Sequence, residues 1–242
     1  MTRLVAVYFD QPGGLYGRMA RVLDYTARKH NPEWQVDVLA IAPSRLQARR
    51  PAYADNSWKL EHWVQAVVQA PNGARVLLMD ADTFVLGPLD GIFEGAWDVA
   101  VTARAQGCRY PVNAGVVAVQ VGPKARAFME SWLRIDRRIL VNPVEHALYV
   151  KAFGGHNQTS LGILRAGGSA GARVVEVPGL QWNCEDTLWK HFSPQVTRVV
   201  HVKSALRMAV GGLNAGAAHA VVAPLARAWG ALEREAVAQA GA

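Results

Sequence analysis

A short apolar run with two aspartates directly behind it constrains this chain more than any other sequence feature. Residues 76–79 are Val, Leu, Leu and Met, which is typical of a strand buried on both faces of a parallel sheet. Asp80 and Asp82 follow, with Ala81 between them, at the point where such a strand leaves the sheet. Ligands of open α/β sheets bind outside the carboxyl ends of the strands, so the pattern predicts a functional site here.

The spacing of the two aspartates indicates a metal site. In extended backbone, residues i and i+2 point the same way, so Asp80 and Asp82 can aim at one point. Two neighbouring carboxylates repel each other unless a cation lies between them. Mg²⁺ or Mn²⁺ suits these oxygen ligands and leaves other coordination positions to water and substrate phosphates. The alternative for the pair alone is an ordinary turn, because Asp side chains often hydrogen-bond nearby backbone.

The order of apolar segments predicts an α/β fold, a single Rossmann-like domain with a mainly parallel, mixed central sheet flanked by helices. Strands at 4–9 and 36–41 enclose a helix that begins at Leu15, which makes a right-handed, parallel βαβ unit. Further strands are expected at 98–102, 113–120, 173–177 and 196–202, and helices at 58–69, at 124–133 and from 144. Segments 44–57 and 153–173 are expected to be loops that choose the acceptor. We expect 1–210 to form the domain and 211–242 to be a C-terminal helical extension of it.

Composition indicates which class of partner the protein binds and in which cellular compartment it is expected. The net charge of +7 favours anionic partners, but no basic stripe with interleaved aromatics predicts nucleic-acid binding. The two cysteines, Cys108 and Cys184, form neither a disulfide framework nor a zinc pattern, so we expect reduced thiols in a cytoplasmic protein. The most apolar C-terminal stretch carries His219, Pro224 and Arg227, so no transmembrane segment is expected.

Five short motifs follow one another along the chain. They are Asp80-Ala81-Asp82, then Asn113-Ala114-Gly115-Val116, then Glu145-His146 before Ala-Leu, then Gln181-Trp182-Asn183, and last His201 and Lys203 at the end of an apolar strand. In this order the motifs resemble a nucleotide-sugar-dependent glycosyltransferase of the A-type fold, closest to glycosyltransferase family 8 of the nucleotide-diphospho-sugar transferase superfamily. The resemblance spans residues 4–203, and it departs from the family at two places. The chain has Ser204 to Arg207 where the family usually has a Gly and a Lys-Pro-Trp, and Glu145-His146 where it usually has an Asp-Gln type of pair.

The resemblance implies transfer of a sugar from a nucleoside diphosphate to an acceptor hydroxyl, with retention more often than inversion. It implies that Asp80 and Asp82 hold Mn²⁺ or Mg²⁺, with His201 as a third ligand. Glu145 would be the catalytic carboxylate, which acts on the reacting carbon or only positions donor hydroxyls.

The substrate contacts implied by the resemblance form a larger set. They are Lys59, Asp80, Ala81, Asn113, Ala114, Gly115, His146, Trp182, Asn183 and Lys203, with the two lysines on phosphate oxygens and the 113–115 strand on the donor ribose or sugar. Several of these residues also have ordinary structural explanations. Trp182 suits a core, Asn183 suits a turn, and Lys59 suits an exposed helix face.

Two rival functions remain at this point. A strand ending in Asp-x-Asp also occurs in haloacid-dehalogenase-type phosphatases, but there the motif normally lies on the first strand, and Phe84 stands here in place of the expected Thr or Val. The second rival is a catalytically degenerate domain that binds a nucleotide sugar or a partner protein, which the two departures from the family favour.

Overall fold

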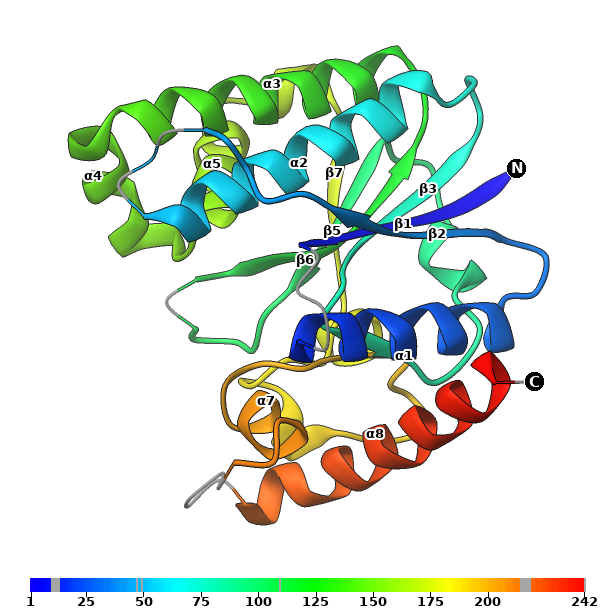
Figure 1. Ribbon diagram of the computed structural model, residues 1–242. Coiled ribbons are helices and arrows are strands. Elements are labelled where there is room, and N and C mark those ends of the chain that lie inside the picture. Colours follow the sequence, from blue (N-terminus) through cyan, green and yellow to red (C-terminus); the bar gives the residue numbers. More distant parts are fainter. Residues whose placement is uncertain (10–13, 47, 49, 109, 214–218, 242) are drawn as a thin grey trace.

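A six-stranded mixed sheet forms the centre of the structure, a computed structural model that describes residues 1–9, 14–46, 48, 50–108, 110–213 and 219–241 (Figure 1). Its strands lie in the order β2-β1-β3-β6-β5-β7. Their bounds are β1 (Thr2–Phe9), β2 (Gln35–Ile41), β3 (Arg75–Asp80), β5 (Val99–Ala103), β6 (Val112–Gln120) and β7 (Val174–Val177). Among these strands β6 runs antiparallel to its neighbours β3 and β5, while β1 is parallel to β2 and β3, and β5 to β7. The mainly parallel, mixed sheet expected from the sequence is confirmed.

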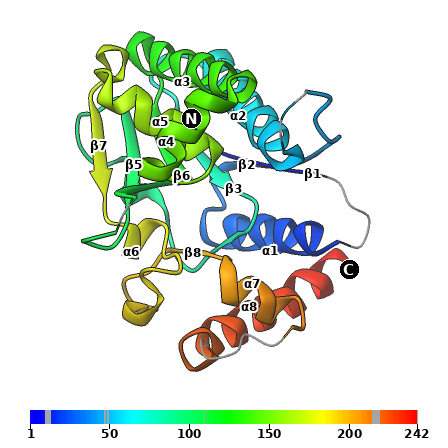
Figure 2. The same cartoon turned by 90° about the vertical axis from the view of Figure 1, so that its left-hand side faces the viewer.

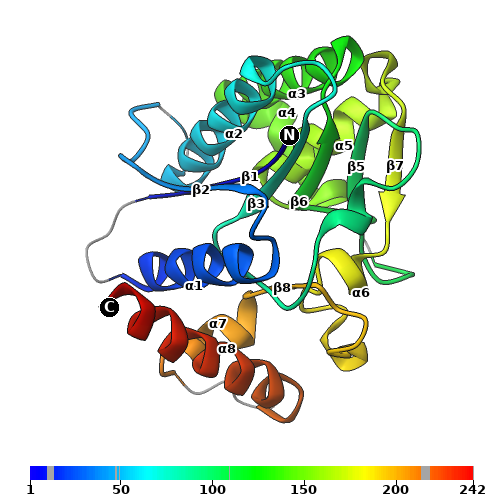
Figure 3. The same ribbon diagram turned by 90° about the vertical axis from the view of Figure 1, so that its right-hand side faces the viewer.

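Helices cover both faces of this sheet (Figure 3). Helices α2 (Pro51–Gln69), α3 (Pro123–Val141) and α5 (His156–Ala166) lie on one face, α1 (Leu15–His30) lies on the other, and α4 (Pro143–Phe153) packs on α3 and α5. The central strand β3 alternates between the two cores: Val76 and Leu78 pack toward α2 and α3, and Leu77 and Met79 pack toward α1. This double burial explains the continuous apolar run in the sequence. No described helix combines the length and apolar character that crossing a bilayer requires.

A further helical layer lies beneath α1 (Figure 2). It consists of α7 (Ser204–Val210) and α8 (His219–Ala240), which pack on α1 and on each other. Beside it, β4 (Thr83–Val85) and β8 (Val199–His201) form a small antiparallel pair, and α6 (Gly179–Trp182) precedes β8. Residues 214–218 and 242 of the expected C-terminal extension lie outside the described residues, and the boundary at residue 210 stays a prediction.

Two expected loops contain helices. Helix α2 begins at Pro51 rather than at residue 58, because Pro51 starts its first turn and Ala54 and Ser57 are buried. The segment 153–173, expected to be a loop, contains α5, which is rich in weak helix formers but buries Leu161 and Leu164 in the core. Tertiary packing therefore stabilises helices that local propensity does not predict.

Candidate metal centre

The connection between β3 and β4 places the two aspartates beside the end of β8. Strand β3 ends at Asp80, and β4 begins at Thr83, which pairs with His201 in the antiparallel register. The hydroxyl of Thr83 donates to the carbonyl of Asp80 at 2.7 Å, and the N–H of Val202 donates to the carbonyl of Asp82 at 2.7 Å. These two hydrogen bonds to the carbonyl groups of the aspartates hold the turn in place.

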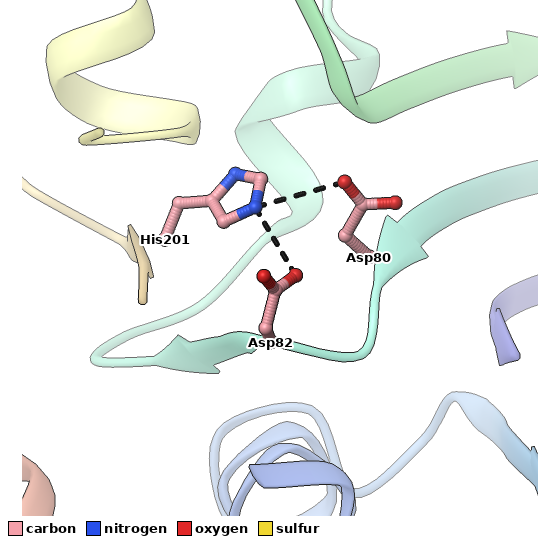
Figure 4. A group of neighbouring side chains, drawn as sticks. All are labelled: Asp80, Asp82 and His201. Carbon is pink, nitrogen blue, oxygen red and sulfur yellow. Dashed lines mark hydrogen bonds and ion pairs between the residues drawn. The ribbon is translucent and has the colours of Figure 1, made fainter. Parts of the chain in front are cut away.

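Asp80, Asp82 and His201 converge on one point, as Figure 4 shows. The Nε2 atom of His201 lies 3.1 Å from Oδ1 of Asp82 and 3.6 Å from Oδ2 of Asp80. One potential ligand atom from each residue lies within 4.8 Å of the others. Asp82 and His201 are buried, whereas Asp80 is half-buried at the surface of a cavity. Two carboxylates and an imidazole at this spacing fit Mn²⁺ or Mg²⁺, with coordination positions left on the cavity side.

A chain of buried hydrogen bonds makes Nδ1 of His201 a hydrogen-bond donor. The Thr102 hydroxyl donates to the carbonyl of Asn113 at 3.0 Å, and Oδ1 of Asn113 accepts from the N–H of Gly115 at 2.7 Å. The side-chain N–H groups of Asn183 donate to the Thr102 hydroxyl oxygen at 2.8 Å and to Oδ1 of Asn113 at 3.1 Å. Oδ1 of Asn183 therefore faces Nδ1 of His201, 2.9 Å away, and must accept from it. Because Nδ1 is held as a donor, Nε2 is the ring nitrogen that faces the carboxylates, and in its deprotonated form it can ligate a metal ion.

Gly115 provides the space in which the imidazole lies. A Cβ atom on Gly115 would stand 2.3 Å from Cε1 and 2.7 Å from Nδ1 of His201. The structure therefore places the predicted Asn113-Ala114-Gly115 segment behind the imidazole, with all three residues buried in β6. Asn183, also predicted as a substrate contact, lies in the same layer and orients the ring. Direct contact of these four residues with a donor stays a prediction.

Basic side chains surround the two carboxylates. Lys59 of α2 forms an ion pair with Asp80, and Arg207 of α7 forms an ion pair with Asp82. Burial alone would raise the pKa of Asp82, but His201, Arg207 and Lys203 stabilise the carboxylate and hold its pKa well below the usual range. Asp82 is therefore ionised at any physiological pH and available to a cation.

The cluster opens into a cavity of about 420 Å³. Its lining comes from the ends of β1 and β3, the start of α1, one face of α2, and the segment that follows β8: Val7, Tyr8, Phe9, Tyr16, Ala52, Asp55, Asn56, Lys59, Asp80, Ala81, Asp82, His201, Lys203 and Arg207. The predicted residues Lys59, Ala81 and Lys203 thus line the same cavity as Asp80, Asp82 and His201. Burial raises the pKa of Tyr16, and the carboxylate of Asp82 adds to this effect, so its hydroxyl stays neutral.

Sequence reasoning missed several lining residues. Arg207 was noted only as a departure from the family, although it reaches the metal cluster. Asp55, Asn56 and Lys59 share one face of α2 at the spacing of one helical turn. This pattern is present in the sequence, but it lies on one helix only because α2 begins at Pro51 rather than at residue 58.

Besides the 113–115 segment and Asn183, three more predicted site residues lie away from the cavity lining. Glu145 stands in the first turn of α4, where its N–H donates to Oδ1 of Asn142 at 3.0 Å and its carboxylate pairs with Arg138 at 2.7 Å. His146 is buried, borders a separate cavity of about 150 Å³, and has its ring 4.7 Å from that of Tyr53.

Trp182 is the third of these residues, and it packs in the apolar core beside Gly91. The predicted catalytic role of Glu145 and the substrate contacts of His146 and Trp182 stay predictions.

Comparisons with known proteins concern the fold. No family model matches the chain, and no curated protein matches it either. A glycosyltransferase involved in glycosylation of the major capsid of PBCV-1 superposes with a TM-score of 0.53 at 12% identity, over 83% of this chain and 93% of that one. The galactosyltransferase LgtC, solved with donor and acceptor sugar analogues, gives 0.52 at 10% identity, over 83% and 86%. The glycosyltransferase GlyE of Streptococcus pneumoniae TIGR4 gives 0.57 at 12% identity, over 98% of this chain and 63% of that one. The chain therefore has the A-type glycosyltransferase fold that its motifs predict.

Proposed function

We propose that this protein is a metal-dependent glycosyltransferase that moves a sugar from a nucleoside diphosphate to an acceptor hydroxyl, with retention. The observation that carries the proposal is the cluster of Asp80, Asp82 and His201 at the carboxyl end of β3, facing a cavity on a glycosyltransferase fold. A cavity of about 420 Å³ is within the usual range for a small-molecule site, roughly 300–1,000 Å³. Retention rests on the resemblance to family 8 alone.

The residues around the cavity have different roles in such a transfer. Asp80, Asp82 and Nε2 of His201 would hold Mn²⁺ or Mg²⁺, which when bound supplies Lewis-acid stabilisation of the departing diphosphate. Lys59, Lys203 and Arg207 line the same cavity and neutralise phosphate oxygens as fixed positive charges.

The remaining lining suits the other parts of the donor. Tyr8 and Tyr16 offer ring faces to a base. Asp55 and Asn56 offer polar groups to sugar hydroxyls. Asp55 is also a lining carboxylate outside the metal cluster, so it competes with Glu145 for the role that the resemblance gives to Glu145.

A thermal-shift screen tests the donor and the metal together. The protein is heated with nucleoside diphosphates and their sugars, with and without Mn²⁺, because a ligand that binds the folded state raises the melting temperature. Selective stabilisation by one base in the presence of Mn²⁺ is expected. Sugar-nucleotide turnover should then appear with Mn²⁺ and disappear in Asp82→Ala, and turnover that is independent of Asp82 would contradict the proposal.

The second candidate is a domain that binds a nucleotide sugar without transferring it. The observation in its favour is the ion pair of Glu145 with Arg138, which engages the predicted catalytic carboxylate at the surface of α4. Turnover of any sugar nucleotide by the intact metal cluster excludes this candidate. Binding without turnover, for every donor and a broad panel of acceptors, supports it.

A further inference from the structure

In each of the two aspartates of the proposed metal site, one carboxylate oxygen faces His201 and the other is bonded to a basic side chain. Oδ2 of Asp80 faces Nε2 of His201, and its Oδ1 is bonded to Lys59. Oδ1 of Asp82 faces the same Nε2, and its Oδ2 is bonded to Arg207. The inner oxygens thus point to the cation position, while the outer oxygens are held by cationic groups of the protein itself.

The two basic side chains come from opposite sides of the sheet and are both anchored. Lys59 belongs to α2 and lies over the ring of Trp63, with its Nζ 4.5 Å from the ring centroid. Arg207 belongs to α7, donates from Nε to the carbonyl of Val202 at 3.2 Å, and lies over the ring of Tyr16. Their helices lie above and below the sheet in Figure 1. Both positive charges therefore lie against the carboxylates and also line the cavity, where a bound diphosphate can reach them.

Formal charges in the cavity balance without a metal ion. The cations Lys59, Lys203 and Arg207 match the three lining carboxylates, and an imidazole that ligates a metal ion adds no charge to this sum. A divalent cation alone would leave an excess of two positive charges in a partly enclosed space. A nucleoside diphosphate sugar carries about two negative charges, one on each of its two linked phosphates, and restores neutrality. The charge inventory therefore favours a cation and a diphosphate together over a cation alone.

We propose that Lys59 and Arg207 make metal binding depend on the diphosphate, an inference that rests on the proposed function. Without the diphosphate, the two basic groups hold the outer carboxylate oxygens and repel a dication at the inner ones. With the diphosphate, they turn to its oxygens, and the repulsion becomes attraction between the two ligands. The donor and its cation then enter as a pair, and the empty enzyme retains little metal.

Calorimetric titration of Mn²⁺ tests this coupling directly. The wild-type protein is titrated alone and with whichever diphosphate of adenosine, cytidine, guanosine, uridine or thymidine stabilises it. The diphosphate should tighten Mn²⁺ binding at least about tenfold, within the usual range of coupling between two ligands. In Arg207→Met, Mn²⁺ alone should bind about threefold more tightly, because a nearby positive charge is gone. With the diphosphate present, the same variant should bind Mn²⁺ about tenfold more weakly than wild type.

The Arg207→Met change is thus expected to tighten Mn²⁺ binding without the diphosphate and to weaken it with the diphosphate. This reversal distinguishes the proposed role from simple structural support. If Arg207 only held Asp82 in place, its loss would weaken Mn²⁺ binding by the same factor with and without the diphosphate, and that result would overturn the inference. Lys59→Met should show the same reversal of sign, and Arg207→Lys should retain the coupling. Arg165→Met is the matched control, because Arg165 pairs with Glu176 away from the cavity lining and should change neither affinity. Circular dichroism checks that each variant is folded.

The wild-type titrations distinguish failure of the inference from failure of the proposed function. If no diphosphate of the panel binds wild-type protein in the presence of Mn²⁺, the proposed function fails and the coupling fails with it. If a diphosphate binds and tightens Mn²⁺ binding, but the Arg207 and Lys59 variants show no reversal, only the inference is overturned.

Discussion

Gly115 lies against the imidazole of His201, and its missing side chain decides where that ring can be. A Cβ atom there would fall 2.3 Å from Cε1 of the ring, which is far inside van der Waals contact. His201 is fully buried and hydrogen-bonded through Nδ1 to Asn183, so its ring cannot move away from an added Cβ without breaking these contacts. At the scale of single residues, the position of His201, the proposed third metal ligand, depends on two neighbours that need not touch a metal ion.

Gly115→Ala should displace the imidazole and weaken Mn²⁺ binding at least about tenfold, as loss of a supporting partner does in metal sites. Calorimetry in the presence of the diphosphate measures the effect. Gly122→Ala is the control, because a Cβ there meets no atom within 4 Å. Equal Mn²⁺ affinity in wild type and Gly115→Ala would show that the ring is not a ligand.

Asn183→Ala should lower Mn²⁺ affinity by about 10- to 100-fold, because the proton on Nδ1 of His201 loses its acceptor. The tautomer with Nε2 protonated then becomes accessible and cannot ligate. The exposed Asn72 serves as the control for an asparagine-to-alanine change. An undiminished affinity in Asn183→Ala would mean that the ring selects its tautomer without this bond.

The thiol of Cys184 should resist alkylation in the folded protein. Burial raises its pKa to about 12, and the neighbouring Glu185 carboxylate adds to the shift, so the reactive thiolate is scarce at pH 8. Mass spectrometry after brief iodoacetamide treatment should find the half-buried Cys108 modified and Cys184 intact. Denaturant should make both cysteines reactive, and rapid modification of native Cys184 would contradict the structure.

At the scale of elements, α5 shows how packing overrides local preference. The helix contains Gly162, against which the ring of Phe153 from the end of α4 lies so closely that a Cβ would meet it at 2.3 Å. Trp132 of α3 donates to the Ser160 hydroxyl at 2.9 Å, and that hydroxyl donates to the buried Asp136 at 2.8 Å. These contacts from α3 and α4 stabilise a segment whose composition alone indicates a loop.

Gly162→Ala should destabilise the protein by about 1–3 kcal/mol, because an added methyl group must displace the Phe153 ring. The free energy of unfolding in urea measures the change. Gly167→Ala is the control, since a Cβ there makes only ordinary contacts at 3.4 Å and beyond. If both variants unfolded at the same urea concentration, the close packing of α4 on α5 would be in doubt.

Strands were more predictable than the residues that support the site. Apolar runs such as 76–79 predict their strands because burial on two faces requires them, and the order of motifs brings His201 to Asp80 and Asp82. No sequence pattern tells which glycine lies under which ring, since Gly115 and His201 meet only through the fold. Arg207 was equally hidden, because its contact with Asp82 crosses from α7 to the start of β4.

At the scale of the whole molecule, α8 supports the wall of the cavity from outside. It packs on α1, where Glu233 pairs with Arg18 at 2.6 Å, and on α7, which carries Arg207. Its buried residues Val222, Leu225 and Trp229 belong to the same apolar cluster as Met19 and Val22 of α1. The C-terminal helix is thus packed against the helices that bear Tyr16 and Arg207.

Trp229→Ala should cost about 3–5 kcal/mol of stability, the usual effect of removing a buried tryptophan side chain. If α8 is part of the same domain, as the sequence predicts, unfolding should remain one cooperative transition. Differential scanning calorimetry checks both points, with the half-exposed Val237→Ala as the control. A separate early transition confined to the variant would indicate an independent C-terminal unit.

The pairing of β4 with β8 has a consequence for biosynthesis. It joins Asp82 to a histidine 119 residues later in the chain, so a ribosome exposes both acids long before it supplies the imidazole. A polypeptide that ends before Val199 contains all six strands of the large sheet, yet it lacks the nitrogen donor and Arg207. A metal ion held by all three proposed ligands therefore requires a chain that has been synthesised at least as far as His201.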